Sequence, residues 1–139
     1  MGRATSWHAL KKGLVGIGAV VAGYAIIAVL SELVQETWLG GVSFRHSSLW
    51  TLVLAGVFTP MGGVAGGFVA GAIGRSLPLA HGLALSTVIG TETTYLIARH
   101  RVDGPLWFEA GAGVTLAAAV MLGAWLSQRW PIRTSGQAE

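Results

Sequence analysis

The chain has 139 residues, of which 53% are hydrophobic and 11% are charged, and it contains no cysteine. This composition favours a membrane protein over a soluble domain, and the lack of cysteine excludes disulfides, iron–sulfur clusters, thiolate zinc sites and covalently attached haem. The net charge of +3 arises from few charges in all, so we expect no nucleic-acid partner.

Four stretches that are nearly free of Lys, Arg, Asp and Glu predict four membrane-spanning helices. A helix needs roughly 20 apolar residues to cross a hydrocarbon core about 30 Å thick. The predicted spans cover approximately residues 13–35, 49–74, 77–98 and 106–128. The predicted fold is therefore all-α: an integral membrane four-transmembrane-helix bundle that forms a single membrane domain over residues 1–139.

The two ends of the chain carry further expectations. The first apolar run, Gly13–Leu30, follows several basic residues, as a secretory signal does. The run is long for a signal, and no small-x-small cleavage site precedes the polar Ser31–Glu36 segment, so we expect the run to be retained. The polar tail Arg129–Glu139 is expected to fray.

Basic residues predict the orientation, because cytoplasmic loops carry an excess of Lys and Arg. One side holds Arg3, Lys11, Lys12, Arg75, Arg129 and Arg133, whereas the other holds Arg45, Arg99 and Arg101. Tryptophans mark both predicted boundaries: Trp38, Trp50 and Trp107 at the outer one, and Trp7, Trp125 and Trp130 at the inner one. We therefore expect a multi-pass membrane protein with both termini cytoplasmic.

The second predicted span is dominated by glycine. One i+4 row consists of Gly62, Gly66, Ala70 and Gly74, and a neighbouring row consists of Gly63, Gly67 and Gly71. Small residues let the backbone of another helix approach closely in a membrane. We expect this span to lie at the centre of the bundle.

The other spans carry small residues at the same spacing. The third has Gly82, Ser86, Gly90 and Thr94, the fourth has Gly111, Thr115, Ala119 and Gly123, and the first has Ala19 and Gly23. These faces are typical of helix packing, within one chain or in a homo-oligomer. Alternatively, the glycines line a pore or let helices slide during transport.

Glu92 is out of place in the third predicted span, where a carboxylate costs a few kcal/mol unless it is protonated or partnered. In one interpretation the carboxyl is neutral and bonded to a neighbouring helix, or reaches outward toward Arg99. In the other it belongs to an ion or substrate path. Glu32, Glu36 and Glu109 fall near the same boundary and complete one candidate acidic vestibule.

Other sites find less support. His46 and His100 fall in loops at the rim of this vestibule, but the residues lack a metal-ligand spacing, so we predict no metal. His81 is expected to be a hydrogen-bonded packing residue, with a single axial ligand to haem or chlorophyll as the alternative; we predict no cofactor. No nucleophile has a base at recognisable spacing, so we predict no enzymatic activity.

The stretch GGVAGGFVAGAIGR followed by LPLAHGLAL resembles the central hairpin of a family of small, uncharacterised four-span bacterial inner-membrane proteins. In that family a glycine-rich helix ends at a basic turn, and a histidine-glycine pair opens the next span. The resemblance implies the four-span architecture and a bacterial inner membrane, and it implies no activity.

Two functional interpretations follow. The leading one is a non-enzymatic packing or accessory component of a membrane assembly, whose partners are the lipid bilayer and either further copies of itself or larger membrane subunits. The competing one is a small homo-oligomeric transporter or channel that uses Glu92. Hydration around Glu92 discriminates them: dry and partnered for the first, connected to water for the second.

Overall fold

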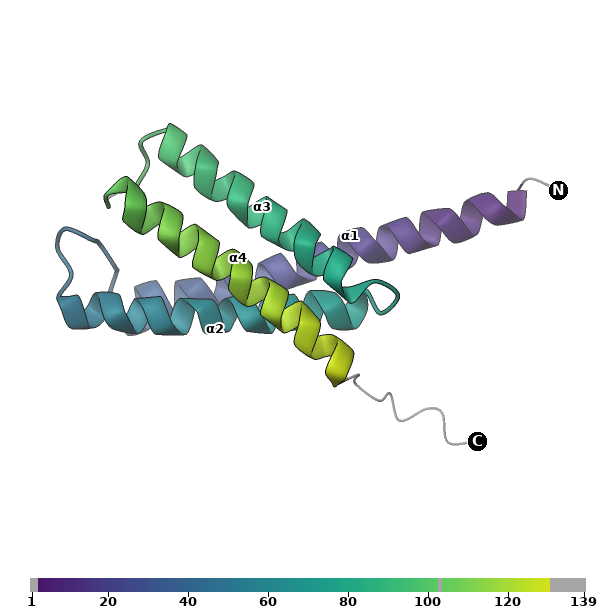
Figure 1. Cartoon of the computed structure of the whole chain (residues 1–139), viewed down its shortest axis with the longest axis horizontal. Helices are drawn as coiled ribbons and strands as arrows, with labels where there is room; N and C mark the ends of the chain where they lie inside the picture. The colour runs from purple at the N-terminus through teal and green to yellow at the C-terminus, as the bar shows by residue number, and fades with distance from the viewer. Residues whose placement is uncertain (1–2, 103, 131–139) are drawn as a thin grey trace.

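The computed structural model describes residues 3–102 and 104–130, which form four long α-helices and one π-helical segment (Figure 1). The elements are α1 (Arg3–Glu32), η1 (Leu33–Trp38), α2 (Leu49–Ile73), α3 (Pro78–Ala98) and α4 (Leu106–Arg129). The predicted all-helical class is therefore confirmed. The tail that was expected to fray lies, beyond Trp130, outside the described residues.

Three of the helical segments are long and apolar enough to cross a membrane: Leu10–Trp38, Leu49–Ile73 and Leu106–Arg129. Helix α3 is not among them. Its 21 residues include His81, Glu92 and several hydroxyl side chains, which lower its mean hydropathy. The described residues thus form an all-helical fold in which three segments are both long and apolar enough to span a membrane, where the sequence predicted four spans.

The first helical segment differs from its predicted bounds at both ends. Helix α1 begins at Arg3 instead of residue 13, and its N-terminal part projects beyond the other helices (Figure 1). Basic side chains at Lys11 and Lys12 limit membrane burial without interrupting a helix, so the charge pattern does not mark the helix start. The π-helical segment η1 was not predicted, because its wider turn leaves no periodic signal over six residues.

Local residues explain the other boundaries. Ser48 caps α2, since its side chain accepts a hydrogen bond from the Thr51 backbone N–H at 3.1 Å. Pro78 is the first residue of α3, a position whose backbone N–H has no hydrogen-bond acceptor within the helix, so its absence in proline does not weaken the helix. After η1 the chain turns through Gly40 and Gly41, whose φ angles of 71° and 90° favour glycine.

Helix α2 packs against α1, α3 and α4, and its buried residues are all glycine or alanine. Its contact with α1 is reciprocal. A Cβ added to Gly66 would lie 2.5 Å from the Gly23 carbonyl oxygen, and one added to Gly23 would lie 2.7 Å from the Gly66 carbonyl oxygen. Only residues without side chains permit this approach of two backbones.

The contact between α2 and α4 has the same character. A Cβ on Gly67 would overlap the backbone of Val120, and one on Gly123 would overlap the backbone of Val64. Adjacent glycines, Gly66 and Gly67, thus face different helices.

The two glycine rows of α2 divide between its neighbours. In the first row Gly62 lies against Leu30 of α1, and Gly74 lies against the His81 ring of α3. In the second row Gly63 lies against Leu116 of α4, and Gly71 lies against Ser127. The predicted central place of this helix agrees with these contacts.

Only some of the small residues of α3 and α4 lie in contacts between helices. Gly82 is buried against Ala124 of α4, and the Ser86 hydroxyl donates to the Ala117 carbonyl oxygen at 3.1 Å. Gly90 and Gly111 are exposed, and a Cβ on either would meet no described atom of a neighbouring element within 4 Å. Unlike Gly82, these two glycines leave open space where a side chain would lie.

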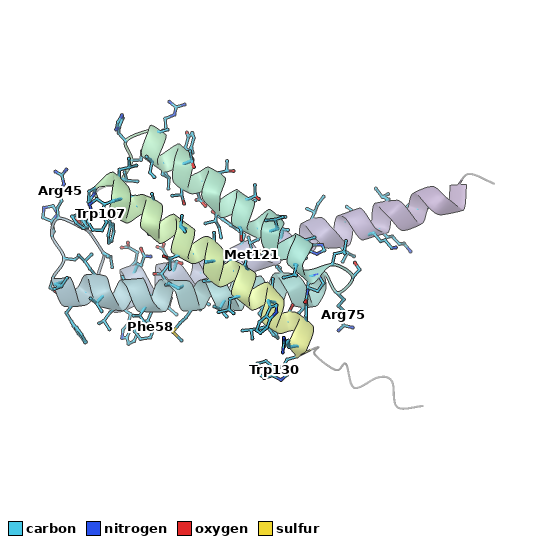
Figure 2. The ribbon with its side chains drawn as sticks, viewed as in Figure 1. Arg45, Phe58, Arg75, Trp107, Met121 and Trp130 are labelled. Atoms are coloured by element: carbon cyan, nitrogen blue, oxygen red, sulfur yellow. The ribbon has the colours of Figure 1, made fainter. Side chains whose placement is uncertain are left out.

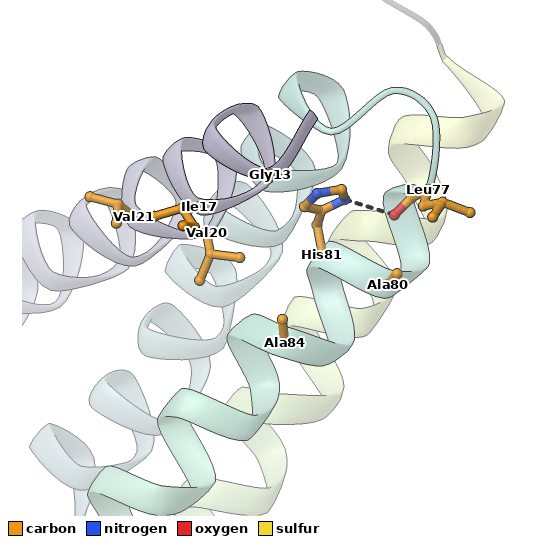
Figure 3. A pocket seen from close by; sticks show the side chains of 9 residues that line it. Gly13, Ile17, Val20, Val21, Leu77, Ala80, His81 and Ala84 are labelled. Atoms are coloured by element: carbon orange, nitrogen blue, oxygen red, sulfur yellow. Dashed lines mark hydrogen bonds between the residues drawn. The ribbon is translucent and has the colours of Figure 1, made fainter. Parts of the chain in front are cut away.

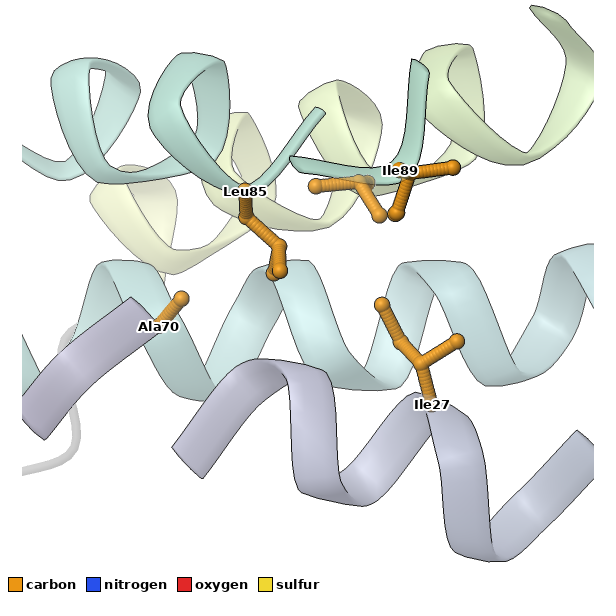
Figure 4. Packing of buried hydrophobic residues seen from close by; sticks show 5 residues of the cluster. Ile27, Ala70, Leu85 and Ile89 are labelled. Atoms are coloured by element: carbon orange, nitrogen blue, oxygen red, sulfur yellow. The ribbon is translucent and has the colours of Figure 1, made fainter. Parts of the chain in front are cut away.

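A small apolar core lies where all four α-helices meet. It consists of Ile27, Ala70, Leu85, Ile89 and Val120, of which Leu85 and Val120 are the largest fully buried side chains (Figure 4). Many other large apolar side chains are exposed, as expected for helices whose outer faces meet lipid rather than water.

Candidate functional site

Glu92 lies near the C-terminal end of α3 and is bonded to α1. Its Oε2 atom accepts a hydrogen bond from the Tyr24 hydroxyl at 2.8 Å. Of the two partners considered from the sequence, a neighbouring helix and Arg99, the structure has the first. The Arg99 guanidinium instead lies over the Tyr95 ring, 5.5 Å from its centroid.

An acidic cleft of approximately 360 Å³ opens beside this hydrogen bond, between α1, η1, α3 and α4. Its polar lining consists of Tyr24, Ser31, Glu32, Gln35, Glu36 and Glu92, together with Thr93. Three carboxylates from two segments of the chain thus share one cleft. No Lys, Arg or His is among the described residues that line it.

The end of α1 and the π-helical segment position the carboxylates of Glu32 and Glu36. The segment is held to α2 by a hydrogen bond from Gln35 Nε2 to Thr59 Oγ1 at 3.2 Å. Ser31, one residue before Glu32, has a buried hydroxyl oxygen with no hydrogen-bond partner among the described residues. This oxygen is available to a molecule or ion in the cleft.

Glu109 does not join this cleft. It lines a neighbouring cavity of approximately 450 Å³, which has Gln35 and Leu116 in common with the acidic cleft. Its Oε1 accepts the Gly104 backbone N–H at 3.0 Å, so the carboxylate holds the loop before α4. His46 and His100 line neither cavity.

The lining offers oxygen ligands, which suit protons and hard cations. The oxygens are distributed around a cleft instead of converging on one point. Accordingly, no group of three or more His, Cys, Asp or Glu side chains within residues 3–102 and 104–130 is placed to hold a metal ion. The arrangement suits a proton on one of the carboxyls, or a cation that keeps part of its hydration shell.

His81 lies far from this cleft, at the start of α3. Its Nδ1 donates to the Leu77 carbonyl oxygen at 2.8 Å, and its ring lies beside Gly16 of α1 and beside Gly74, the residue that follows α2. The ring therefore takes part in helix packing, as the first of the two sequence interpretations expected.

Sequence reasoning missed Tyr24, Ser31 and Gln35 as members of the site. Tyr24 lies in an apolar run, where its hydroxyl needs a hydrogen-bond partner. This need was the feature of the sequence that could have identified Tyr24 as a member of the site. Ser31 and Gln35 carry no such signal, because short polar residues at a span boundary are ordinary.

The chain matches no protein-family model, no curated protein and no solved structure. The function is therefore inferred from the geometry of the acidic cleft.

Proposed function

We propose that this chain is a small, non-enzymatic membrane protein that binds a proton or a small cation in the acidic cleft and passes it along a path that uses Glu92. The observation that carries the proposal is that Glu32, Glu36 and Glu92 line one cleft whose described lining has no basic side chain. A cleft lined by carboxylates and by no described cation attracts a proton or a cation in preference to an anion.

The cost of placing Glu92 within a membrane strengthens the proposal. A carboxylate within a membrane segment costs a few kcal/mol, and such groups occur mainly where they face a partner, a cavity or a transport path. Glu92 faces both a partner, Tyr24, and a cavity. The unpartnered Ser31 hydroxyl supplies a further oxygen for a bound ion.

We further propose that α3 crosses the membrane beside α4 and so completes a four-span bundle. In this arrangement the protein lies in a bacterial inner membrane, and both termini are cytoplasmic. Helix α3 packs against α4 from Gly82, beside Ala124, to Thr93, beside Gly113. At about 1.5 Å per residue its 21 residues extend roughly 31 Å, enough to span the hydrocarbon core. The contacts of α3 with the more apolar α4 compensate for the lower hydropathy of α3.

A second candidate function is an accessory role in a membrane assembly, with further copies of the chain or larger membrane subunits as partners. The observation that favours it is the exposed strip of α3 around Gly90. The Thr87, Thr91 and Thr94 hydroxyls on this helix bond to carbonyl oxygens of their own helix at 2.7–2.9 Å. With these polar groups satisfied and Gly90 free of neighbours, the strip suits close approach by another helix.

Ion flux in liposomes tests the first function. Wild-type protein should pass protons or one of a panel of alkali cations, and Glu92→Gln should abolish the flux while leaving the melting curve in detergent unchanged. An amide retains the shape of the carboxyl but cannot exchange a proton near neutral pH.

Glu109→Gln is the matched control, because it removes a carboxylate at the same end of the molecule from outside the acidic cleft. This variant should retain the flux. If wild-type protein carries neither protons nor cations, the transport function is wrong, and a stoichiometric membrane partner that co-purifies in mild detergent would then support the accessory role.

A further inference from the structure

Two adjoining cavities lie at the opposite end of the molecule from the acidic cleft. A basic cleft of approximately 270 Å³ is lined by Lys11, Lys12, Arg75, Ser76 and His81 among others. An apolar groove of approximately 480 Å³ between α1 and α3 is lined by Ile17, Val20, Val21 and Ala84 among others (Figure 3). Gly16 and His81 belong to both linings, so the two cavities meet at the imidazole ring.

Two glycines hold the ring at this junction. A Cβ on Gly74 would overlap the His81 ring, and one on Gly16 would lie 3.1 Å from its Nε2 atom. Because the Leu77 carbonyl oxygen can only accept, the Nδ1 atom must carry the hydrogen of the bond between them. Nε2 has no hydrogen bond among the described residues, so it remains available to a ligand.

The charges of the basic cleft are not balanced within the described chain. Lys11, Lys12 and Arg75 form no ion pair there. The described carboxylates, Glu32, Glu36, Glu92 and Glu109, line cavities at the other end. None of these four carboxylates lines the basic cleft, so an anion from another molecule can complement its three cations.

We propose that the two cavities together bind one anionic phospholipid. Its phosphate lies in the basic cleft among Lys11, Lys12 and Arg75, and an acyl chain lies in the apolar groove between α1 and α3. The juxtaposition of a cationic cleft with an apolar groove matches the two halves of a lipid, and basic pockets between membrane helices bind such headgroups. The inference rests on the membrane location of the helices and not on ion passage at Glu92.

Native mass spectrometry of delipidated protein in mild detergent tests the proposal. Phosphatidylglycerol should bind more tightly than phosphatidylcholine with the same acyl chains. Replacing Lys11, Lys12 and Arg75 with Gln should weaken phosphatidylglycerol binding by about fivefold for each charge removed, because each cation near a lipid surface contributes about 1 kcal/mol. The Arg99→Gln, Arg101→Gln variant, which loses cations outside both cavities, should bind as wild type.

A second pair of variants tests the groove. Gly13 lines it and Gly18 does not, yet a Cβ on either would meet no described atom of another element within 4 Å. Gly13→Leu should therefore fill the groove and weaken lipid binding at least several-fold, whereas Gly18→Leu should not.

Three results would overturn the proposal. The first is equal affinity for the two lipids. The second is equal loss of binding in the Arg99→Gln, Arg101→Gln control. The third is displacement of phosphatidylglycerol by inorganic phosphate at comparable concentration, which would identify a site for a free anion instead of a lipid.

Discussion

At the scale of single residues, the hydrogen bond between Tyr24 and Glu92 is the feature with the clearest chemical meaning. It joins α1 to α3 over 68 positions of sequence and places a carboxylate beside a cleft that holds two more. Glu92, identified from sequence by its cost in lipid, thus has both a partner and a cavity. Glu109, which lines the adjoining cavity, has a different role: it accepts a hydrogen bond from the backbone of the loop before α4.

Removal of the Tyr24 hydroxyl should change the environment of Glu92 and leave the fold intact. For Tyr24→Phe we expect a loss of roughly 0.6 kcal/mol, which is the average for interhelical hydrogen bonds measured in a membrane protein. The infrared carboxyl band that disappears in Glu92→Gln should shift in Tyr24→Phe, because its oxygen loses a donor. Tyr95→Phe removes a hydroxyl with no hydrogen bond among the described residues, so it should leave the band unmoved. An unchanged band in Tyr24→Phe would contradict the hydrogen bond.

At the scale of elements, α2 organises the molecule because it has glycine where other helices have side chains. Its two rows lie against different helices, one mainly against α1 and the other against α4. The closest approaches pair glycine with backbone: Gly66 with Gly23, and Gly67 with Val120. In water, helices associate because large apolar side chains become buried. Here dispersion contacts between closely packed backbones hold the helices together instead.

Replacing a buried glycine of α2 with a larger residue should therefore lower the free energy of unfolding far more than the same replacement at an exposed glycine of this helix. Gly67→Leu would place a side chain in the backbone of Val120, and we expect it to lower the free energy of unfolding by roughly 3 kcal/mol or more. Gly56→Leu, where an added Cβ meets nothing within 4 Å, should change it by less than about 1 kcal/mol. Melting curves in detergent measure both. Equal tolerance of the two changes would mean that α4 does not pack on this row.

At the scale of the whole molecule, charge and tryptophan divide between two ends. Arg45 and Trp107 lie at one end, and Arg75 and Trp130 lie at the other (Figure 2). All six tryptophans are exposed. Exposed tryptophans at both ends of apolar helices are typical of the two interfaces of a bilayer.

Thiol labelling on intact cells decides whether α3 crosses the membrane, since the chain has no cysteine of its own. In a four-span protein, an impermeant reagent should label Ser47→Cys and Val102→Cys, and should label Ser76→Cys only after permeabilisation. Ser76 and Val102 flank α3, so they lie on opposite sides only if this helix spans. If the two cysteines are labelled alike, the molecule has three spans and its ends lie on opposite sides.

The sequence by itself determined the helical class, the approximate bounds of α2, α3 and α4, and the small-residue faces of α2. These properties depend on the length of apolar runs and on residue volume, which are local. The sequence also indicated that Glu92 needs a partner, because the cost of a carboxylate in lipid does not depend on the neighbours that satisfy it.

Only the tertiary structure decided which groups meet. The rotation and crossing of the helices place Tyr24 against Glu92, bring Glu32 and Glu36 into the same cleft and leave Glu109 outside it. The same geometry leaves Gly90 and Gly111 exposed, although their spacing matches that of the buried glycines. An i+4 spacing defines a face of a helix, but what that face contacts depends on all the other helices at once, because close packing is a property of the assembled bundle.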